Sequence, residues 1–485
     1  MCWVSRIKLF LAIIAVFLVS CDAMAQSEKS PFQKTLYDIL SLDSIQTDSM
    51  LMTLDNRLEK AYLMHYKIFI KQMFDGQWPL DYDRQLELIV DSLEENESKD
   101  ERAIAFLSEV YIQKGIMEFS VEHQRAAVFS FFKAYRFWRR SKSEYPQLTE
   151  NIKLAGVFNL LMGNMPQPYR RMAGWIGFSG NDSIGFNALK TNYYANSHKE
   201  GSKQEALLYL AYAYLKFDPG EEKIKNLILD SSFEDLLPLT QFIVARCAFK
   251  IRKPVLNDAW LRNSERDDFL PLVYLRGKYK VLINDDSGAE DLVLFSRRNT
   301  SGQFQADAYR YHSWQLFLEG DTSGYLQLQN SIKDLNYYPT WEDKQARNES
   351  GLDVMPHSML LRSRLLFDAG YYQAAIDSLL TVDFKSISEP GQQVEFQYRL
   401  GRCYHLLNQR TTAIFHYTEA IRLGENDTRY FAPYAAVFTA ELHKDQNPVT
   451  ARFFLEEAKR LNNGEYKDAV ERKIQLLSEQ LETPH

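Results

Sequence analysis

The chain has 485 residues, of which 45% are hydrophobic, 13% aromatic and 25% charged. So many large apolar side chains exclude a collagen-like or largely disordered protein. Lys and Arg total 57 against 64 Asp and Glu, which gives a net charge of −7. We expect no nucleic-acid binding, because the sequence shows no basic stripe and such binding needs clustered Lys and Arg. The length fits about three ordinary domains or one long repeat array.

The N-terminal segment, residues 1–25, has the features of an export signal. Two basic residues precede an apolar run at 10–19, which matches a signal-peptide core and is too short for an ordinary transmembrane helix. Leu-Val-Ser-Cys, ending at Cys21, resembles a bacterial lipobox, whose cysteine carries the lipid. Ala-Met-Ala, ending at Ala25, is the alternative cleavage site and would release an unlipidated chain. We therefore predict export to the periplasm or the outer membrane and leave both cleavage sites open.

Beyond this segment the apolar residues recur at helical spacing, and no convincing stretch alternates with period two. The clearest unit, 394–427, places Gly401 in a first helix and Ala413, Tyr417 and Ala420 in a second. This is the 34-residue tetratricopeptide pattern, in which a small residue sits where two antiparallel helices touch. Similar units come before and after it. We therefore predict an all-α, tetratricopeptide-like solenoid of helical hairpins, a right-handed superhelix with a concave surface.

The same periodicity divides the chain into successive regions. After the signal, these are an N-terminal helical region (26–98), degenerate helical repeats (99–335) with a Pro- and Gly-rich insert (163–182), an irregular connecting segment (336–356), the clear C-terminal repeats (357–464), and a capping helix with a tail (465–485). A loop as long as the connecting segment is often functional in a packed array. Cys247 and Cys403 lie in apolar helical patterns without a C-x-x-C spacing, so we interpret them as core residues.

Several short motifs resemble those of tetratricopeptide proteins related to the eukaryotic inclusion-body-clearance and tetratricopeptide-repeat-thirty-nine proteins, a family with bacterial relatives. They are G-V-F-N-L-L at 156–161, M-P at 165–166, G-F-S-G-N at 177–181, Y-L-R-G at 274–277, L-R-S-R-L-L-F-D-A-G-Y-Y at 361–372 and Y-R-L-G-R at 398–402. Together such matches extend over roughly residues 100–480. The resemblance implies a helical-repeat scaffold without catalytic residues. The export signal and the region of about 30–95 depart from the family, so an organelle role does not carry over.

Motifs for catalysis and for metal or cofactor binding are absent from the sequence. The nine histidines include no H-E-x-x-H pair, and neither a G-x-S-x-G elbow nor a phosphate-binding Gly-rich loop occurs. Acidic pairs occupy exposed helical positions, and nothing in their spacing joins two carboxylates for acid–base chemistry. We therefore predict a protein that is not an enzyme and that carries no metal or cofactor.

The predicted concave face supplies the candidate binding residues. In a tetratricopeptide unit, the side chains one and four positions beyond the small first-helix residue point into this face. These are Arg364 and Phe367 in one unit and Arg402 and His405 in the next, with Tyr398 one turn earlier. Two arginines one repeat apart can form bidentate pairs with the carboxylates of an extended peptide or a chain terminus. The alternative, in which each arginine pairs with a glutamate of a neighbouring helix, stays open.

A second basic feature is the segment 136–142, where arginines are interleaved with aromatic residues. Such a pattern occurs in segments that bind nucleic acid or anionic lipid. The segment also ends a predicted helix, where cations interact favourably with the helix dipole. We interpret it as a helix end.

These features favour an exported, non-enzymatic scaffold that binds a protein or peptide through its concave face in the bacterial cell envelope. A lipid on Cys21 is its predicted route to the membrane. The alternative is a lipoprotein that captures a glycan or peptide nutrient for an outer-membrane transporter, since such proteins also contain helical hairpins and the 28 tyrosines can supply stacking surfaces. Binding of a free glycan without a protein partner would favour this alternative.

Overall fold

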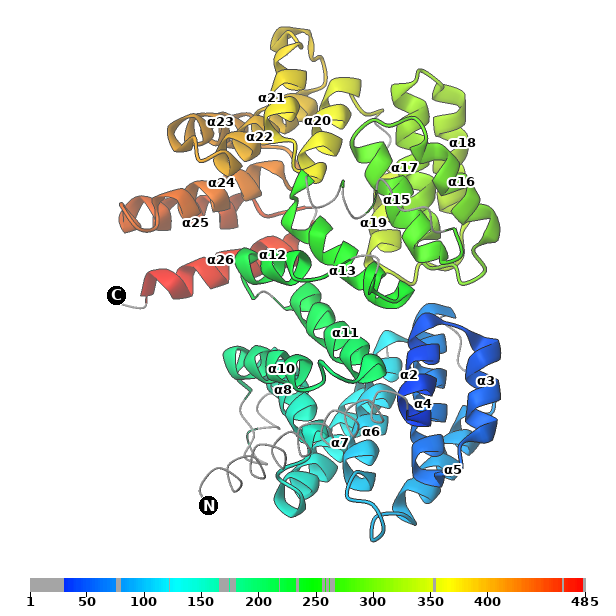
Figure 1. Ribbon diagram of the computed structural model, residues 1–485. Coiled ribbons are helices and arrows are strands. Elements are labelled where there is room, and N and C mark those ends of the chain that lie inside the picture. The colour runs from blue at the N-terminus through cyan, green and yellow to red at the C-terminus, as the bar shows by residue number, and fades with distance from the viewer. Residues whose placement is uncertain are drawn as a thin grey trace, which may run out of the picture. The chain divides into compact units, whose positions relative to one another are not determined.

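The structure is a computed structural model that describes residues 30–482, apart from 76–79, 122, 165–173, 175–179, 218, 233–234, 255–257, 259–260, 262–266, 352–354 and 465. Throughout these residues the regular elements are helices and no β-strand is present (Figure 1). This confirms the predicted all-α fold of helical hairpins. None of the described helices is long and apolar enough to cross a bilayer. The signal with Cys21 and most of the 163–182 insert lie outside the described residues.

The chain divides into two compact units. Unit 1 comprises Met1–Ile251, Asn263–Leu275 and Arg298–Phe304, and unit 2 comprises Arg252–Arg262, Arg276–Arg297 and Gln305–His485. The helices of unit 1 are α2 (Pro31–Ser41), α3 (Ser44–Thr53), α4 (Arg57–Asp75), α5 (Tyr82–Glu94), α6 (Ala103–Ser120), α7 (Gln124–Glu144), α8 (Thr149–Gly163), α10 (Asp182–Ala195), α11 (Glu200–Lys216), α12 (Glu221–Leu229) and α13 (Pro238–Ile251). The boundary falls within α15 (Leu270–Leu282) and again within α16 (Gly288–Arg298). The other helices of unit 2 are α17 (Gln305–Leu318), α18 (Thr322–Asp334), α19 (Trp341–Ser350), α20 (Ser358–Ala369), α21 (Tyr372–Leu380), η3 (Phe384–Ser386), α22 (Pro390–Leu406), α23 (Arg410–Leu423), α24 (Phe431–His443), α25 (Pro448–Leu461) and α26 (Lys467–Glu482).

Unit 1 contains helices with polar N-caps and one close crossing between two helices. The side chains of Ser30, Asp43 and Asn181 accept hydrogen bonds from first-turn amides of α2, α3 and α10. Each cap satisfies a backbone N–H that has no partner inside its own helix. Between α8 and α10 the backbones approach so closely that a Cβ at Gly156 would lie 2.7 Å from Leu189. A larger residue at this glycine would therefore force the two helices apart.

Unit 2 contains the repeats that are clearest in the sequence. α20 pairs with α21, α22 with α23 and α24 with α25, and α26 follows (Figure 1). In the α22–α23 hairpin, a Cβ at Gly401 would lie 2.5 Å from Cδ1 of Tyr417, and Ala413, Tyr417 and Ala420 are fully buried. The predicted contact between a small and a large residue is therefore present. The first helices α20, α22, α24 and α26 also contact one another in that order.

The segment 336–356, expected to be irregular, contains the helix α19, which corrects the sequence interpretation. α19 begins with a capping box, in which the Thr340 hydroxyl accepts from the Asp343 amide and the Asp343 carboxylate accepts from the Thr340 amide. The buried side of α19 is mostly polar, since it consists of Asp343, Ala346 and Ser350. Apolar periodicity, the main signal for a helix in a sequence, is therefore missing here.

Cys247 in unit 1 and Cys403 in unit 2 are buried free thiols, which agrees with the core role expected for them. Burial raises the pKa of each thiol to about 12. Both therefore stay protonated at neutral pH and behave as small apolar residues.

Candidate functional site

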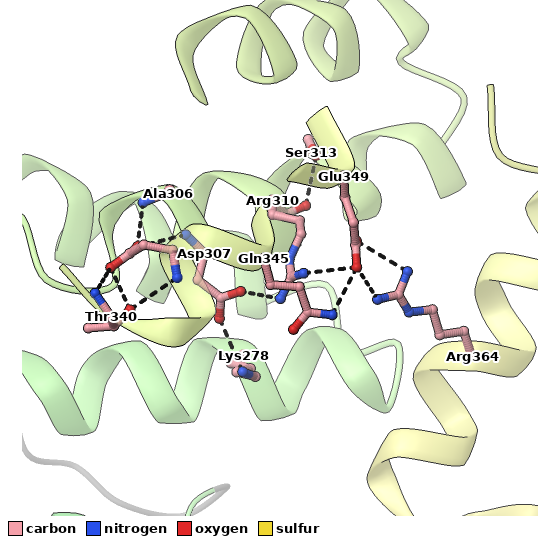
Figure 2. Close-up of polar contacts among 10 residues, drawn as sticks. Lys278, Ala306, Asp307, Arg310, Ser313, Thr340, Gln345, Glu349 and Arg364 are labelled. Carbon is pink, nitrogen blue, oxygen red and sulfur yellow. Dashed lines mark hydrogen bonds and ion pairs between the residues drawn. The ribbon is translucent and has the colours of Figure 1, made fainter. Parts of the chain in front are cut away.

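Arg364, one of the predicted binding residues on α20, is held by other parts of unit 2. Its guanidinium donates to both carboxylate oxygens of Glu349, at 2.7 and 3.2 Å, and lies over Trp314 with 4.6 Å to the ring centroid. Figure 2 shows the pair. Glu349 belongs to α19, so the structure gives Arg364 the alternative left open by the sequence, a glutamate of a neighbouring helix.

Glu349 is part of a buried ion network formed by Lys278, Asp307, Arg310, Glu349 and Arg364 (Figure 2). Asp307 accepts from Lys278 at 3.1 Å and also from Arg310, whose Nη1 lies 3.2 Å from Oε1 of Glu349. Burial raises the pKa of Glu349, but Arg364 and Arg310 outweigh it and bring the pKa to about 2. Glu349 is therefore ionised at neutral pH, and Arg364 is occupied within the protein.

Phe367 and Tyr398, also predicted to line the binding face, are core residues. They are only 8% and 9% exposed. The ring of Phe367 packs against Tyr372, and that of Tyr398 against Phe431, each with 5.3 Å between centroids. Both side chains were predicted to point toward the concave face, but their rings lie beneath the surface. Neither ring is therefore free to stack on a ligand.

Arg402, on α22, has a different environment. Its guanidinium lies 3.9 Å from the ring centroid of Phe438 on α24 and 5.4 Å from that of Phe367 on α20. Lys473 of α26 lies 4.6 Å from the centroid of Phe438, and Arg252 lies 5.0 Å from that of Phe367. Cations and rings thus alternate in the order Arg252, Phe367, Arg402, Phe438, Lys473, and we call this set the cation–aromatic ladder.

The described residues neutralise only part of the positive charge of the ladder at short range. Arg252 pairs with Asp368 at 3.3 Å. Within the described chain no carboxylate lies at ion-pair distance from Arg402 or Lys473, although Glu441 acts on both from farther away. Burial lowers the pKa of Lys473, and together with Arg402 it outweighs the opposing effect of Glu441. An anion bound beside these cations would raise this pKa again.

His405, the last of the predicted binding residues, lies beside Arg402. Its Nδ1 is 3.2 Å from the hydroxyl of Tyr417, and its ring meets Phe438 edge to face at 6.0 Å. Burial lowers the pKa of His405, and the charge of Arg402 lowers it further. The imidazole is therefore neutral at pH 7 and adds no charge to the ladder.

The sequence identified two members of the ladder, Phe367 and Arg402, and missed the other three. From Phe367 through Arg402 and Phe438 to Lys473, successive members are about one repeat apart along the chain. This spacing, and not an equivalent position within each repeat, is the sequence signal that links them. Arg252 lies outside the clear repeats and has no such signal.

Unit 1 holds a separate buried charge cluster of Glu109, Lys153 and Glu205. Lys153 Nζ lies 2.8 Å from Glu109 and 3.0 Å from Glu205, while the hydroxyls of Tyr209 and Tyr62 donate to Glu109 at 3.0 Å and to Glu205 at 3.3 Å. Burial raises the pKa of Glu205 to about 7, with Lys153 opposing this effect and Glu109 adding to it. The three charged side chains are at most 8% exposed, so the cluster is part of the core and not a substrate site. Elsewhere in the described residues, too, no group of His, Cys, Asp and Glu could hold a metal ion.

Comparison with known proteins adds little to this geometry. No family model and no curated protein matches the chain. Among solved structures, the TPR domain of P58(IPK) is similar at 14% identity and a TM-score of 0.21, with 87% of this chain and 99% of that chain covered. A TM-score this low adds no support, so the all-α hairpin fold rests on the helices described above. The resemblance to the inclusion-body-clearance and tetratricopeptide-repeat-thirty-nine family stays a prediction.

Proposed function

We propose that the chain is an exported scaffold, without enzymatic activity, that binds a protein partner through the cation–aromatic ladder in the bacterial cell envelope. The observation that carries this proposal is the pair Arg402 and Lys473, two cations beside one ring, Phe438, with no carboxylate of the described chain at ion-pair distance. The helices that carry them, α22 and α26, both pack on α24, so the backbone positions of the two charges are fixed relative to each other. Because the two charges are already positioned before binding, a ligand can bind them without a large loss of conformational entropy.

An acidic segment or a chain terminus of the partner has the chemistry that this pair requires. The guanidinium of Arg402 can hold a carboxylate with two parallel hydrogen bonds, and the ammonium of Lys473 adds a point charge. Because Arg402 is half-buried, its attraction for an anion is screened less than at an open surface. The sequence predicted this chemistry for two arginines, and the proposal assigns it to Arg402 with Lys473.

Fluorescence anisotropy with a labelled acidic peptide tests the proposal. The probe is a peptide rich in Asp and Glu, used once with a free C-terminal carboxylate and once amidated, so that side-chain and terminal carboxylates are distinguished. Arg402→Gln and Lys473→Gln remove the two charges. Arg472→Gln is the matched control, because Arg472 precedes Lys473 on α26, is exposed and donates to the carbonyl of Asp468.

Each substitution in the ladder should weaken binding by about ten- to hundredfold, the usual effect of one charge-assisted hydrogen bond. Arg472→Gln should leave binding unchanged apart from a small effect of net charge. Equal affinity of the peptide for the unchanged chain and for the Arg402→Gln/Lys473→Gln double variant would contradict the proposal. Binding of a soluble glycan with an affinity that neither substitution changes would instead favour the nutrient-capture lipoprotein.

A further inference from the structure

The exposed side of α7 in unit 1 carries a one-sided row of basic and aromatic residues. α7 contains six basic residues and one acidic residue. At 100° per residue, five of its side chains lie within a narrow sector opposite the buried face of the helix. They are Arg125, Phe129, Phe132, Arg136 and Arg139, and we call them the basic stripe of α7. The sequence showed basic residues grouped only at 136–142, and the helix extends this face back to Arg125.

The cations of the stripe are free of carboxylate partners within the described chain. Arg125, Arg136 and Arg139 are exposed, and none of them forms an ion pair with another described residue. Arg140, at the edge of the stripe, differs because Glu97 and Glu144 hold it at 2.7 and 2.9 Å. The helix dipole favours cations only in the last turn, where Lys142 lies, so it does not explain Arg125.

An exposed ring stands between these cations. Phe129 is 71% exposed, although a ring of this size gains free energy when it leaves water. Phe132, half-buried, packs against the cluster of Ala127, Phe131 and Met162 and so forms the base of the stripe. The stripe combines positive charge with a protruding apolar group on one face of the helix.

We propose that the basic stripe of α7 binds the surface of a membrane that contains anionic lipids. A helix presents the side chains of one face to a plane at once, here over about 21 Å at 1.5 Å per residue between Arg125 and Arg139. Arginines beside the headgroups and a phenylalanine at the headgroup level are the contacts that interfacial helices make. Duplex DNA offers the same charge but no apolar layer for Phe129, and base stacking requires single strands. The stripe lies in unit 1 and does not depend on the ladder or on a lipid at Cys21.

Vesicle co-sedimentation tests this inference with the chain that starts at Gln26, which lacks both the signal and the candidate lipid site. The probes are vesicles of phosphatidylcholine with phosphatidylglycerol and vesicles of phosphatidylcholine alone, each at low and at high salt. The unchanged chain should sediment with the anionic vesicles at low salt, less at high salt, and not with the neutral vesicles. Arg125→Glu/Arg136→Glu/Arg139→Glu should lose on the order of 100-fold in affinity, from roughly fivefold per arginine.

The matched control is Arg57→Glu/Lys71→Glu/Arg84→Glu, which makes the same change in net charge at exposed positions of α4 and α5. It should keep vesicle binding, and melting followed by circular dichroism should show both triple variants folded. Phe129→Ala should weaken binding to anionic vesicles without changing the melting temperature. Three results would overturn the proposal: no binding of the unchanged chain to anionic vesicles, equal loss in the two triple variants, or a duplex DNA probe that competes fully with the vesicles.

Discussion

The buried cluster around Glu205 makes the stability of unit 1 depend on pH in a direction that can be calculated. The pKa of Glu205 rises from an ordinary value of 4.5 to about 7 in the folded chain. The folded state therefore binds this proton more tightly than the unfolded state does. The resulting stabilisation is complete below pH 4.5 and is lost as the pH rises through 7. At 1.36 kcal/mol per pKa unit, the total loss is roughly 3 kcal/mol.

The substitution Glu205→Gln removes this titration and keeps the shape of the side chain. Relative to the unchanged chain, the variant should gain about 2–3 kcal/mol in unfolding free energy between pH 5 and pH 8. The altered hydrogen bonds to Lys153 and Tyr62 change the unfolding free energy by the same amount at every pH. They therefore do not affect its pH dependence. His65, whose pKa burial lowers to about 4, titrates in the opposite direction, but it is present in both chains and cancels.

Urea denaturation at a series of pH values measures the difference. Glu200→Gln, an exposed change in the first turn of the same helix, is the control and should follow the unchanged chain at every pH. If Glu205→Gln and the unchanged chain keep a constant difference from pH 5 to pH 8, Glu205 titrates normally in the fold. The conclusion that burial keeps Glu205 protonated up to about neutral pH would then be wrong.

Three further substitutions test unit 2 by thermal or urea denaturation. Gly401→Trp should destabilise the C-terminal hairpins by about 1–3 kcal/mol or more, because Tyr417 fills the space, and an unchanged melting transition would contradict the helix contact. Glu349→Ala should cost about 1–3 kcal/mol, since it removes the ion-pair partner of Arg364 and one of the two carboxylates that hold Arg310, whereas Glu419→Ala at an exposed pair should cost under about 1 kcal/mol, and equal costs would argue against the network. Thr340→Ala should cost about 1 kcal/mol by removing the cap of α19, and no change would remove the capping box as the reason for this helix.

The sequence predicted the hairpin fold because apolar side chains recur wherever one helix packs on another. At Gly401 the repeat pattern predicted even the residue that the glycine contacts, Tyr417. α19 was missed because its buried side is formed by polar residues such as Asp343, which capping and hydrogen bonds satisfy instead of apolar packing. A helix that is stabilised by polar contacts shows little apolar periodicity in its sequence.

The candidate site was predicted only in part, for a related reason. Sequence spacing indicates which way a side chain points from its helix, but not what it meets there. Arg364 and Arg402 occupy equivalent repeat positions, yet Arg364 meets Glu349, from the segment expected to be irregular, and Arg402 meets Phe438. Lys473 was missed because the last helix was interpreted only as a cap. Partners from a neighbouring element decide whether a charge is available for binding.

The most direct test of the account is in-cell crosslinking followed by purification of the chain from the envelope fraction and mass spectrometry. Unchanged chain, the Arg402→Gln/Lys473→Gln double variant and the Arg472→Gln control are compared. We expect one envelope protein that crosslinks to the unchanged chain and to the control but not to the double variant. Recovery of the same crosslinked proteins from all three chains, or of none from the unchanged chain, would contradict the claim that the ladder binds a protein partner.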